Sequence, residues 1–138
     1  MAPAKALSPA PVPSSHRQGV KTILVVDDEL ASAEVLSLIL EEEGYRTFCA
    51  ANGQHGLARV QDVNPHLVVL DFMMPVMNGA EMASALRELP DMRHIKILMS
   101  SSLPEETVRH HFSKYDAFLR KPYNVDAALK LIADLLKE

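Results

Sequence analysis

The sequence predicts an α/β fold in which a five-stranded parallel sheet is doubly wound, with helices on both faces. Short apolar runs alternate along the chain with amphipathic stretches, which is the order expected for strands joined by helical crossovers. The runs lack polar alternation, and this is typical of strands buried on both faces. With 138 residues, 48% of them apolar, the chain is long enough for one domain with a substantial core.

The first half of the chain is expected to supply three strands and two helices. The strands are apolar runs at residues 22–26, 46–50 and 67–70, of which the second is the weakest. The helices have apolar residues at helical spacing, at residues 30–43 and 53–63. The apolar face of the first helix is expected to contain Val35, Leu36, Ile39 and Leu40, with Gly44 as the stop signal. The second helix turns Leu57 and Val60 inward and is weakened by Gly56.

The second half is expected to supply two strands and three helices. The strands are at residues 95–99 and 117–119, and the helices are at residues 80–89, 104–114 and 125–137. Pro90 ends the first of these helices, and Pro104 fits the first turn of the next. The last helix is expected to turn Val125, Leu129, Ile132 and Leu136 toward the core.

Composition and charge argue against several classes of protein. The chain has 14 Lys and Arg residues and 18 Asp and Glu residues, for a formal net charge of −4. Because binding to a nucleic-acid backbone needs clustered basic charge, we expect no nucleic-acid partner. The apolar runs are too short to cross a bilayer, so we expect no membrane partner. The single cysteine, Cys49, cannot form an internal disulfide, which favours a reducing, cytoplasmic location.

Residues 1–19 differ in composition from the rest and are predicted to be a disordered tail, ahead of a domain at residues 20–138. The segment holds four of the nine prolines and several serines and alanines, too little apolar surface to offset the entropy of ordering. A secretory signal is the alternative, but the prolines interrupt any apolar stretch of the kind that such signals need.

Chemistry-bearing residues follow four of the five expected strands. They are Asp27 and Asp28, Asp71, Ser100, and Lys121. In open parallel sheets the site lies at the carboxyl ends of the strands, so these side chains should converge. Three carboxylates repel one another unless a hard cation, Mg²⁺ or Mn²⁺, joins them. A lysine and a hydroxyl nearby suit a phosphate, and an aspartate there could attack phosphorus. No glycine-rich loop follows the first strand, so a nucleotide site has no support.

Four segments carry a resemblance to a known family, and each lies at a predicted strand end. They are residues 24–29 (LVVDDE), 69–79 (VLDFMMPVMNG), 97–100 (ILMS) and 119–122 (LRKP). From residue 21 onward the chain resembles the receiver domain of bacterial two-component response regulators. The resemblance implies a flavodoxin-like (βα)5 fold with strand order 2-1-3-4-5. Because nothing follows Glu138, we expect a stand-alone regulator.

The resemblance implies a role for each residue of the set. Asp71 would accept a phosphoryl group from a phosphohistidine on a sensor histidine kinase or a histidine phosphotransfer protein. Asp28 would bind Mg²⁺ directly and Asp27 partly through water, with Asp71 and the backbone carbonyl of Met73 completing the protein ligands. Ser100 would hydrogen-bond a phosphoryl oxygen, and Lys121 would pair with Asp71 and then with the phosphoryl group. The peptide bond before Pro122 is expected to be cis.

Phosphorylation is expected to work as a switch. In the family, the position of Phe118 carries an aromatic side chain that turns between outward and inward orientations. The switched surface would be residues 104–138, which would bind a downstream target protein or pair with a second copy in a phosphorylation-driven dimer. We expect no turnover of a separate substrate, only phosphorylation and dephosphorylation of the chain itself. The apolar Met73 side chain cannot orient an attacking water, so a long-lived phosphoryl group is expected.

Other interpretations of the same residues remain open. Asp27 or Asp28 could cap the helix that begins near residue 30. The chain could pass the phosphoryl group onward in a phosphorelay, or act as a receiver-like scaffold without phosphorylation. A phosphatase of the haloacid-dehalogenase type would need a second acid two residues after Asp71, where this chain has Met73. His111 has a faint likeness to a phosphotransfer histidine but lacks a helical-bundle context.

Overall fold

Five strands and five α-helices alternate along the chain in the computed structural model, which describes residues 19–137. The strands are β1 (Thr22–Val26), β2 (Arg46–Ala50), β3 (Leu67–Asp71), β4 (Lys96–Ser101) and β5 (Ala117–Arg120). The helices are α1 (Leu30–Glu42), α2 (Gly53–Val63), α3 (Gly79–Glu88), α4 (Glu105–His111) and α5 (Val125–Leu135), with a short 3-10 helix, η3 (Pro90–Met92), after α3. Apart from Gly19, the predicted tail lies outside the described residues.

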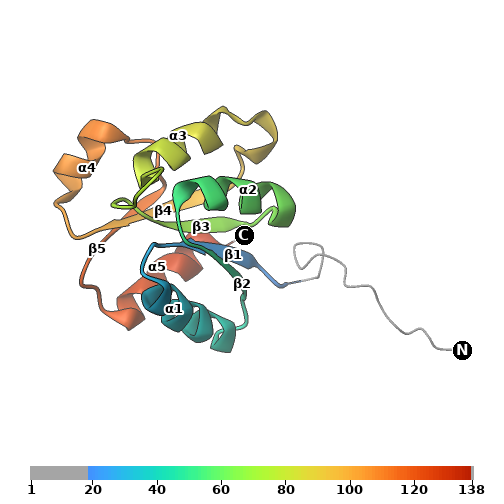
Figure 1. Ribbon diagram of the computed structural model, residues 1–138. Coiled ribbons are helices and arrows are strands. Elements are labelled where there is room, and N and C mark those ends of the chain that lie inside the picture. Colours follow the sequence, from blue (N-terminus) through green and yellow to red (C-terminus); the bar gives the residue numbers. More distant parts are fainter. Residues whose placement is uncertain (1–18, 138) are drawn as a thin grey trace, which may run out of the picture.

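The strands form one parallel sheet in the order β2-β1-β3-β4-β5 (Figure 1). All four neighbouring pairs are parallel, so every connection crosses over through a helix. The strand order changes direction between β1 and β3, and open α/β sheets form their binding crevice at such a point. The predicted fold class and strand order are therefore confirmed.

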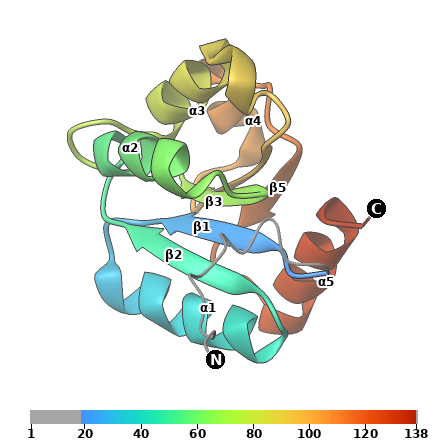
Figure 2. The same cartoon turned by 90° about the vertical axis from the view of Figure 1, so that its right-hand side faces the viewer.

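Helices cover both faces of the sheet, with α1 and α5 on one side and α2, α3 and α4 on the other (Figure 2). Alternate residues of each strand supply the two cores. Facing α1 and α5 are strand residues such as Ile23, Val25 and Val69, whereas Leu24, Val26 and Leu70 face the other three helices. Burial on both sides explains why the strands are apolar without alternation.

Several element boundaries differ by one or two residues from those that the sequence predicts, and the end of α4 differs by three. β4 begins at Lys96 and continues to Ser101, instead of spanning 95–99. α4 ends at His111, three residues before the expected end. The reason is that Phe112 leaves the helix with an extended backbone (φ −164°) and buries its ring in the core. The carbonyl of Lys114 then accepts a hydrogen bond from Arg87 at 3.1 Å.

Two residues that are expected to face the core are exposed instead. Val35 of α1 is 56% exposed and Val125 of α5 is 40% exposed. α1 instead buries a face displaced toward Ala33 and Ser37, and α5 buries Ala128. Small side chains let both helices pack close to the sheet, which leaves the two valines on the rim. Within residues 19–137, no helix has the length and apolar character needed to cross a membrane.

The loop between β3 and α3 contains a strained residue. Val76 has φ +70°, which a β-branched side chain rarely adopts, and it is 75% exposed. The amide of Met77 donates to the carbonyl of Pro75 at 2.7 Å across it, the pattern of a γ-turn. The Met77 carbonyl in turn accepts a hydrogen bond from Gly53 at 3.1 Å, so the turn is tied to the start of α2.

Replacing Val76 with Asn or Gly should stabilise the protein, because both residues tolerate a positive φ. The gain should be about 1 kcal/mol, since strain of this kind costs on the order of 1–3 kcal/mol and Gly also loosens the unfolded chain. Urea unfolding of the variants measures the difference. Val76→Ala is the control, because it removes the side chain and keeps the strained φ. A gain for Ala equal to that for Asn would contradict the assignment of the strain to the backbone.

Candidate functional site

The polar residues that follow the strands meet at the carboxyl edge of the sheet. Asp27 follows β1, Asp71 ends β3, and Lys121 follows β5. Ser100 of β4 pairs directly with Asp71 in the sheet register. Because neighbouring parallel strands end at the same edge, residues far apart in the sequence become neighbours.

Three carboxylates gather at this edge. One oxygen each from Asp27, Asp28 and Asp71 lies within 4.8 Å of the other two. Asp27 and Asp71 are buried, at 8% and 9% exposure, whereas Asp28 is exposed. Burial raises the pKa of Asp71 to about 6; the ammonium of Lys121 opposes that shift, and the Asp27 carboxylate adds to it.

Lys121 partly balances the charge of these acids. Its Nζ lies 3.3 Å from Asp27 Oδ2 and 3.5 Å from Asp71 Oδ1. Burial favours its neutral amine, but the two carboxylates outweigh this and raise the pKa of Lys121. The Lys121–Pro122 peptide bond is cis, as expected.

Ser100 presents an unpaired hydroxyl beside Asp71. The residue is 3% exposed, and its Oγ has no hydrogen-bond partner among residues 19–137. A buried hydroxyl without an acceptor costs free energy, so this group is suited to a ligand oxygen that enters the site. The neighbouring Ser101 differs, because its Oγ accepts a hydrogen bond from the amide of Leu103 at 3.0 Å.

The interpretation of the aspartates as helix caps is only partly borne out. Asp27 Oδ1 accepts a hydrogen bond from the amide of Glu29 at 2.9 Å. The N-cap of α1 is Glu29 itself, which makes no side-chain cap hydrogen bond. Asp27 therefore supports the turn into α1 with one oxygen, and its other oxygen faces Lys121.

The two remaining predicted residues lie at the margin of this set. Met73 is 56% exposed and shares a hollow with Asp28 and Asn78. Phe118 is half-buried and packs against the core on the α3 and α4 side, with its ring 6.1 Å from that of Tyr115. Sequence reasoning missed Tyr123, which lines the hollow around Asp27 and Lys121. The sequence feature that could have identified Tyr123 is its position two residues after Lys121.

Gly79 has a packing role that the sequence alone did not reveal. A Cβ at this position would lie 2.5 Å from the Asp71 carbonyl oxygen and 2.8 Å from the Phe72 Cα. The close approach lets the Gly79 amide donate to the Phe72 carbonyl at 2.9 Å. The start of α3 is thereby fixed against the end of β3, next to Asp71.

The donor set fits a hard divalent cation. All three clustered side chains offer oxygen, which Mg²⁺ and Mn²⁺ prefer. A cation would relieve the repulsion among the acids, which adds to the effect of burial in raising the pKa of Asp71. The ammonium of Lys121, which contacts Asp27 and Asp71, and the unpaired hydroxyl of Ser100, in register with Asp71, could receive the oxygens of a phosphoryl group. The arrangement is thus suited to a carboxylate that acquires a phosphoryl group.

Comparison with known proteins identifies the family that this chain resembles. The model of the response regulator receiver domain family matches residues 23–133. Response regulator RR06 of Streptococcus pneumoniae is 37% identical over 117 residues, or 83% of this chain and 52% of that protein. The probable transcriptional regulatory protein TcrX of Mycobacterium tuberculosis is 29% identical over 84% of this chain and 50% of its own length. The chain spans about half the length of these relatives.

Solved structures give the same result. The chemotaxis response regulator CheY4 of Vibrio cholerae superposes with a TM-score of 0.79 at 28% identity, covering 85% of this chain and 99% of that one. The response regulator TrrA of Thermotoga maritima, solved in complex with Mg²⁺–BeF, has a TM-score of 0.76 at 33% identity. That match covers 84% of this chain and 99% of TrrA.

The raised pKa of Asp71 predicts how stability changes with pH. In the unfolded chain an aspartate has a pKa near 3.8, against about 6 in the fold, so the folded state binds more protons between these values. Without divalent metal, stability should therefore fall as pH rises from about 4 to about 6. The loss should reach at most about 3 kcal/mol relative to Asp71→Asn, which lacks the group.

Urea unfolding of the wild type and Asp71→Asn at several pH values measures this difference. Repeating the series with Mg²⁺ is the control, since a bound cation should reduce the pH dependence. Equal pH profiles for the two proteins in metal-free buffer would contradict the raised pKa.

Proposed function

The chain belongs to the response regulator receiver domain family, and we propose that Asp71 is the residue on which it is phosphorylated. Phosphorylation-dependent signalling is the general function of this family. The observation that carries the proposal is the pairing of a buried carboxylate with an unpaired hydroxyl. Asp71 lies in register with Ser100, whose Oγ lacks a partner, and is 3.5 Å from Lys121 Nζ.

The phosphoryl donor would be a phosphohistidine on a sensor histidine kinase or a histidine phosphotransfer protein. A carboxylate oxygen of Asp71 attacks phosphorus, the new O–P bond forms as the N–P bond breaks, and the bonding electrons return to the imidazole nitrogen. Asp71 must be ionised to attack, and Lys121 favours that form. Ser100 then donates its hydrogen bond to a phosphoryl oxygen, and Lys121 balances the added charge.

Mg²⁺ would be held by the carboxylates of Asp27, Asp28 and Asp71 with the Met73 backbone carbonyl. When bound, the cation supplies charge neutralisation that lets an anionic carboxylate approach an anionic phosphoryl group. The fit rests on the convergent oxygens of the three acids, and TrrA was solved with Mg²⁺–BeF. Mn²⁺ suits the same donors.

The phosphoryl group would act by shifting a conformational equilibrium. Its charge and oxygens at Asp71 favour states in which Ser100 moves toward them. Phe118 is on β5, the strand next to β4, and it pairs with Met99 of β4. A shift of β4 would therefore be felt by the half-buried ring of Phe118. The surface formed by residues 104–138 would then bind a downstream target protein or a second copy.

Residues 20–138 would form the receiver domain, and its reactions would be its own phosphorylation and dephosphorylation. A cytoplasmic location belongs to the same proposal, because phosphohistidine kinases of this system act there. Cys49 is the only cysteine of the chain and is free in the structure, which agrees with a reducing environment.

Asp71→Asn should abolish phosphorylation. Intact mass after incubation with a small phosphodonor and Mg²⁺ should show one added phosphoryl group on the wild type. The adduct should be absent from the variant and absent when Mg²⁺ is chelated. Asp62→Asn, an exposed acid on α2, is the matched control and should behave as the wild type. An adduct that survives in Asp71→Asn would place the acceptor elsewhere.

Ser100→Ala should slow phosphorylation while leaving the fold intact. The lost hydrogen bond to a charged oxygen is worth about 1.5–3 kcal/mol, or roughly 10- to 100-fold in rate. Because the hydroxyl has no partner within residues 19–137, its removal should not lower the free energy of unfolding. Ser84→Ala, at an exposed serine on α3, serves as control. A rate equal to the wild type would refute the role of Ser100.

A further inference from the structure

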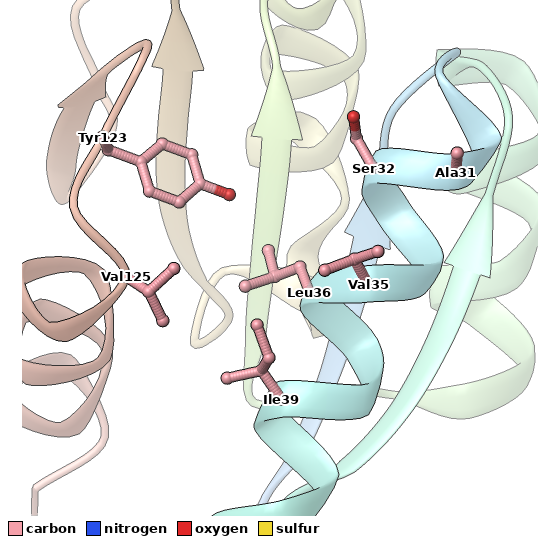
Figure 3. A pocket seen from close by; sticks show the side chains of 7 residues that line it. All are labelled: Ala31, Ser32, Val35, Leu36, Ile39, Tyr123 and Val125. Atoms are coloured by element: carbon pink, nitrogen blue, oxygen red, sulfur yellow. The ribbon is translucent and has the colours of Figure 1, made fainter.

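An apolar groove lies between α1 and the segment that follows β5. Figure 3 shows Leu36 and Ile39 pointing from α1 toward Tyr123 and Val125, with Val35 on the exposed front of the same helix. The groove has a volume of about 320 Å³. Within residues 19–137, Val35 stays 56% exposed and Val125 40% exposed, so apolar surface here is left in contact with water.

The groove continues into the site at the sheet edge. Ser32 and Tyr123 line both the groove and the hollow around Asp27 and Lys121. A segment lying in the groove would therefore also border the approach to Asp71.

The chain enters the fold beside the other end of this groove. The Arg46 amide, at the start of β2, donates to the Lys21 carbonyl at 2.9 Å, and β2 begins shortly after α1 ends at Glu42. The distance along α1 from its end at Glu42 back to Ser32 is roughly 15 Å, at 1.5 Å per residue. Eighteen residues in an extended, proline-type conformation reach roughly 56 Å, so residues 1–18 can span the groove.

Charge favours the same pairing. Residues 1–18 contain Lys5 and Arg17, and all 18 acidic residues of the chain follow them. α1 ends in the exposed run Glu41, Glu42 and Glu43 and has no basic residue in its last turn. A cation is stabilised at a helix C-terminus, so the basic segment and this end of α1 attract each other.

The apolar content of the segment also matches the groove. Residues 9–13 read Pro-Ala-Pro-Val-Pro, and proline-rich segments bind apolar grooves with aromatic walls at a low entropic cost. Tyr123 supplies such a wall, and burial raises the pKa of its hydroxyl. The exposed valines Val35 and Val125 supply the apolar floor and rim.

We propose that residues 1–18 bind in this groove of their own chain, with residues 9–13 against Val35, Ile39 and Tyr123. A segment bound in this way would also border the hollow around Lys121, since Tyr123 lines both. This inference does not depend on phosphorylation, since it concerns only the contact between the segment and the groove.

Paramagnetic relaxation in the full chain tests the proposal. A spin label is attached to Ala10→Cys in a Cys49→Ser background, and methyl signals of Val35 and Ile39 report on the groove. Val63 is the matched control. It is the last residue of α2, which lies on the other face of the sheet, and it is close to the point where the chain enters the fold, because β3 begins four residues later and pairs with the start of β1. The groove methyls should be broadened several-fold more than Val63.

Two further measurements define the origin of the broadening. Lys5→Glu with Arg17→Glu should reduce it toward the level of Val63, and so should higher salt, which screens exposed charges. Broadening of Val35 and Ile39 no greater than that of Val63 would overturn the proposal and leave the groove as a surface for another protein. Excess broadening that disappears on dilution would also overturn it, because the segment would then bind a second copy.

Discussion

The structure depends on a buried carboxylate that is only partly neutralised. Asp71 lies at the end of a central strand with Asp27 beside it, and burial raises its pKa to about 6 although Lys121 Nζ is 3.5 Å away. The parallel sheet enforces this proximity, because β1, β3 and β5 all end at one edge. An arrangement of carboxylates that is only partly neutralised in this way is suited to a cation, which would relieve the repulsion among the acids.

Rigid strands let the protein keep such a site without unfolding. Ser100 holds an unpaired hydroxyl inside the sheet, and Gly79 lets the start of α3 approach the backbone of Asp71 to within a distance that any side chain would prevent. The apolar cores on both faces supply the stabilisation that offsets these polar costs. The backbone strain at Val76 is also a local cost that the surrounding fold sustains. Its turn is held in place because the Met77 carbonyl accepts a hydrogen bond from the Gly53 amide.

Most of the fold was predictable because apolar runs without alternation specify buried parallel strands. The end of α4 was not, because Phe112 leaves the helix for a core position that only the tertiary structure defines. Val35 and Val125 fit a helical period but lie on the rim, since small residues bring α1 and α5 close to the sheet. The convergence of Asp27, Asp28 and Asp71 followed from strand ends alone. The family resemblance implied the contact of Lys121 with Asp71, but its contact with Asp27 and the place of Tyr123 beside them are seen only in the three-dimensional structure.

A crystal structure of the protein with Mg²⁺ and beryllofluoride, a stand-in for the phosphoryl group, would show whether Asp71 is the acceptor. We expect beryllofluoride on an Asp71 oxygen, with Ser100 Oγ and Lys121 Nζ each within hydrogen-bond distance of a fluorine. We also expect Mg²⁺ bound by the acidic cluster. Beryllofluoride on another residue, or Ser100 Oγ still without a partner in the complex, would contradict the proposal.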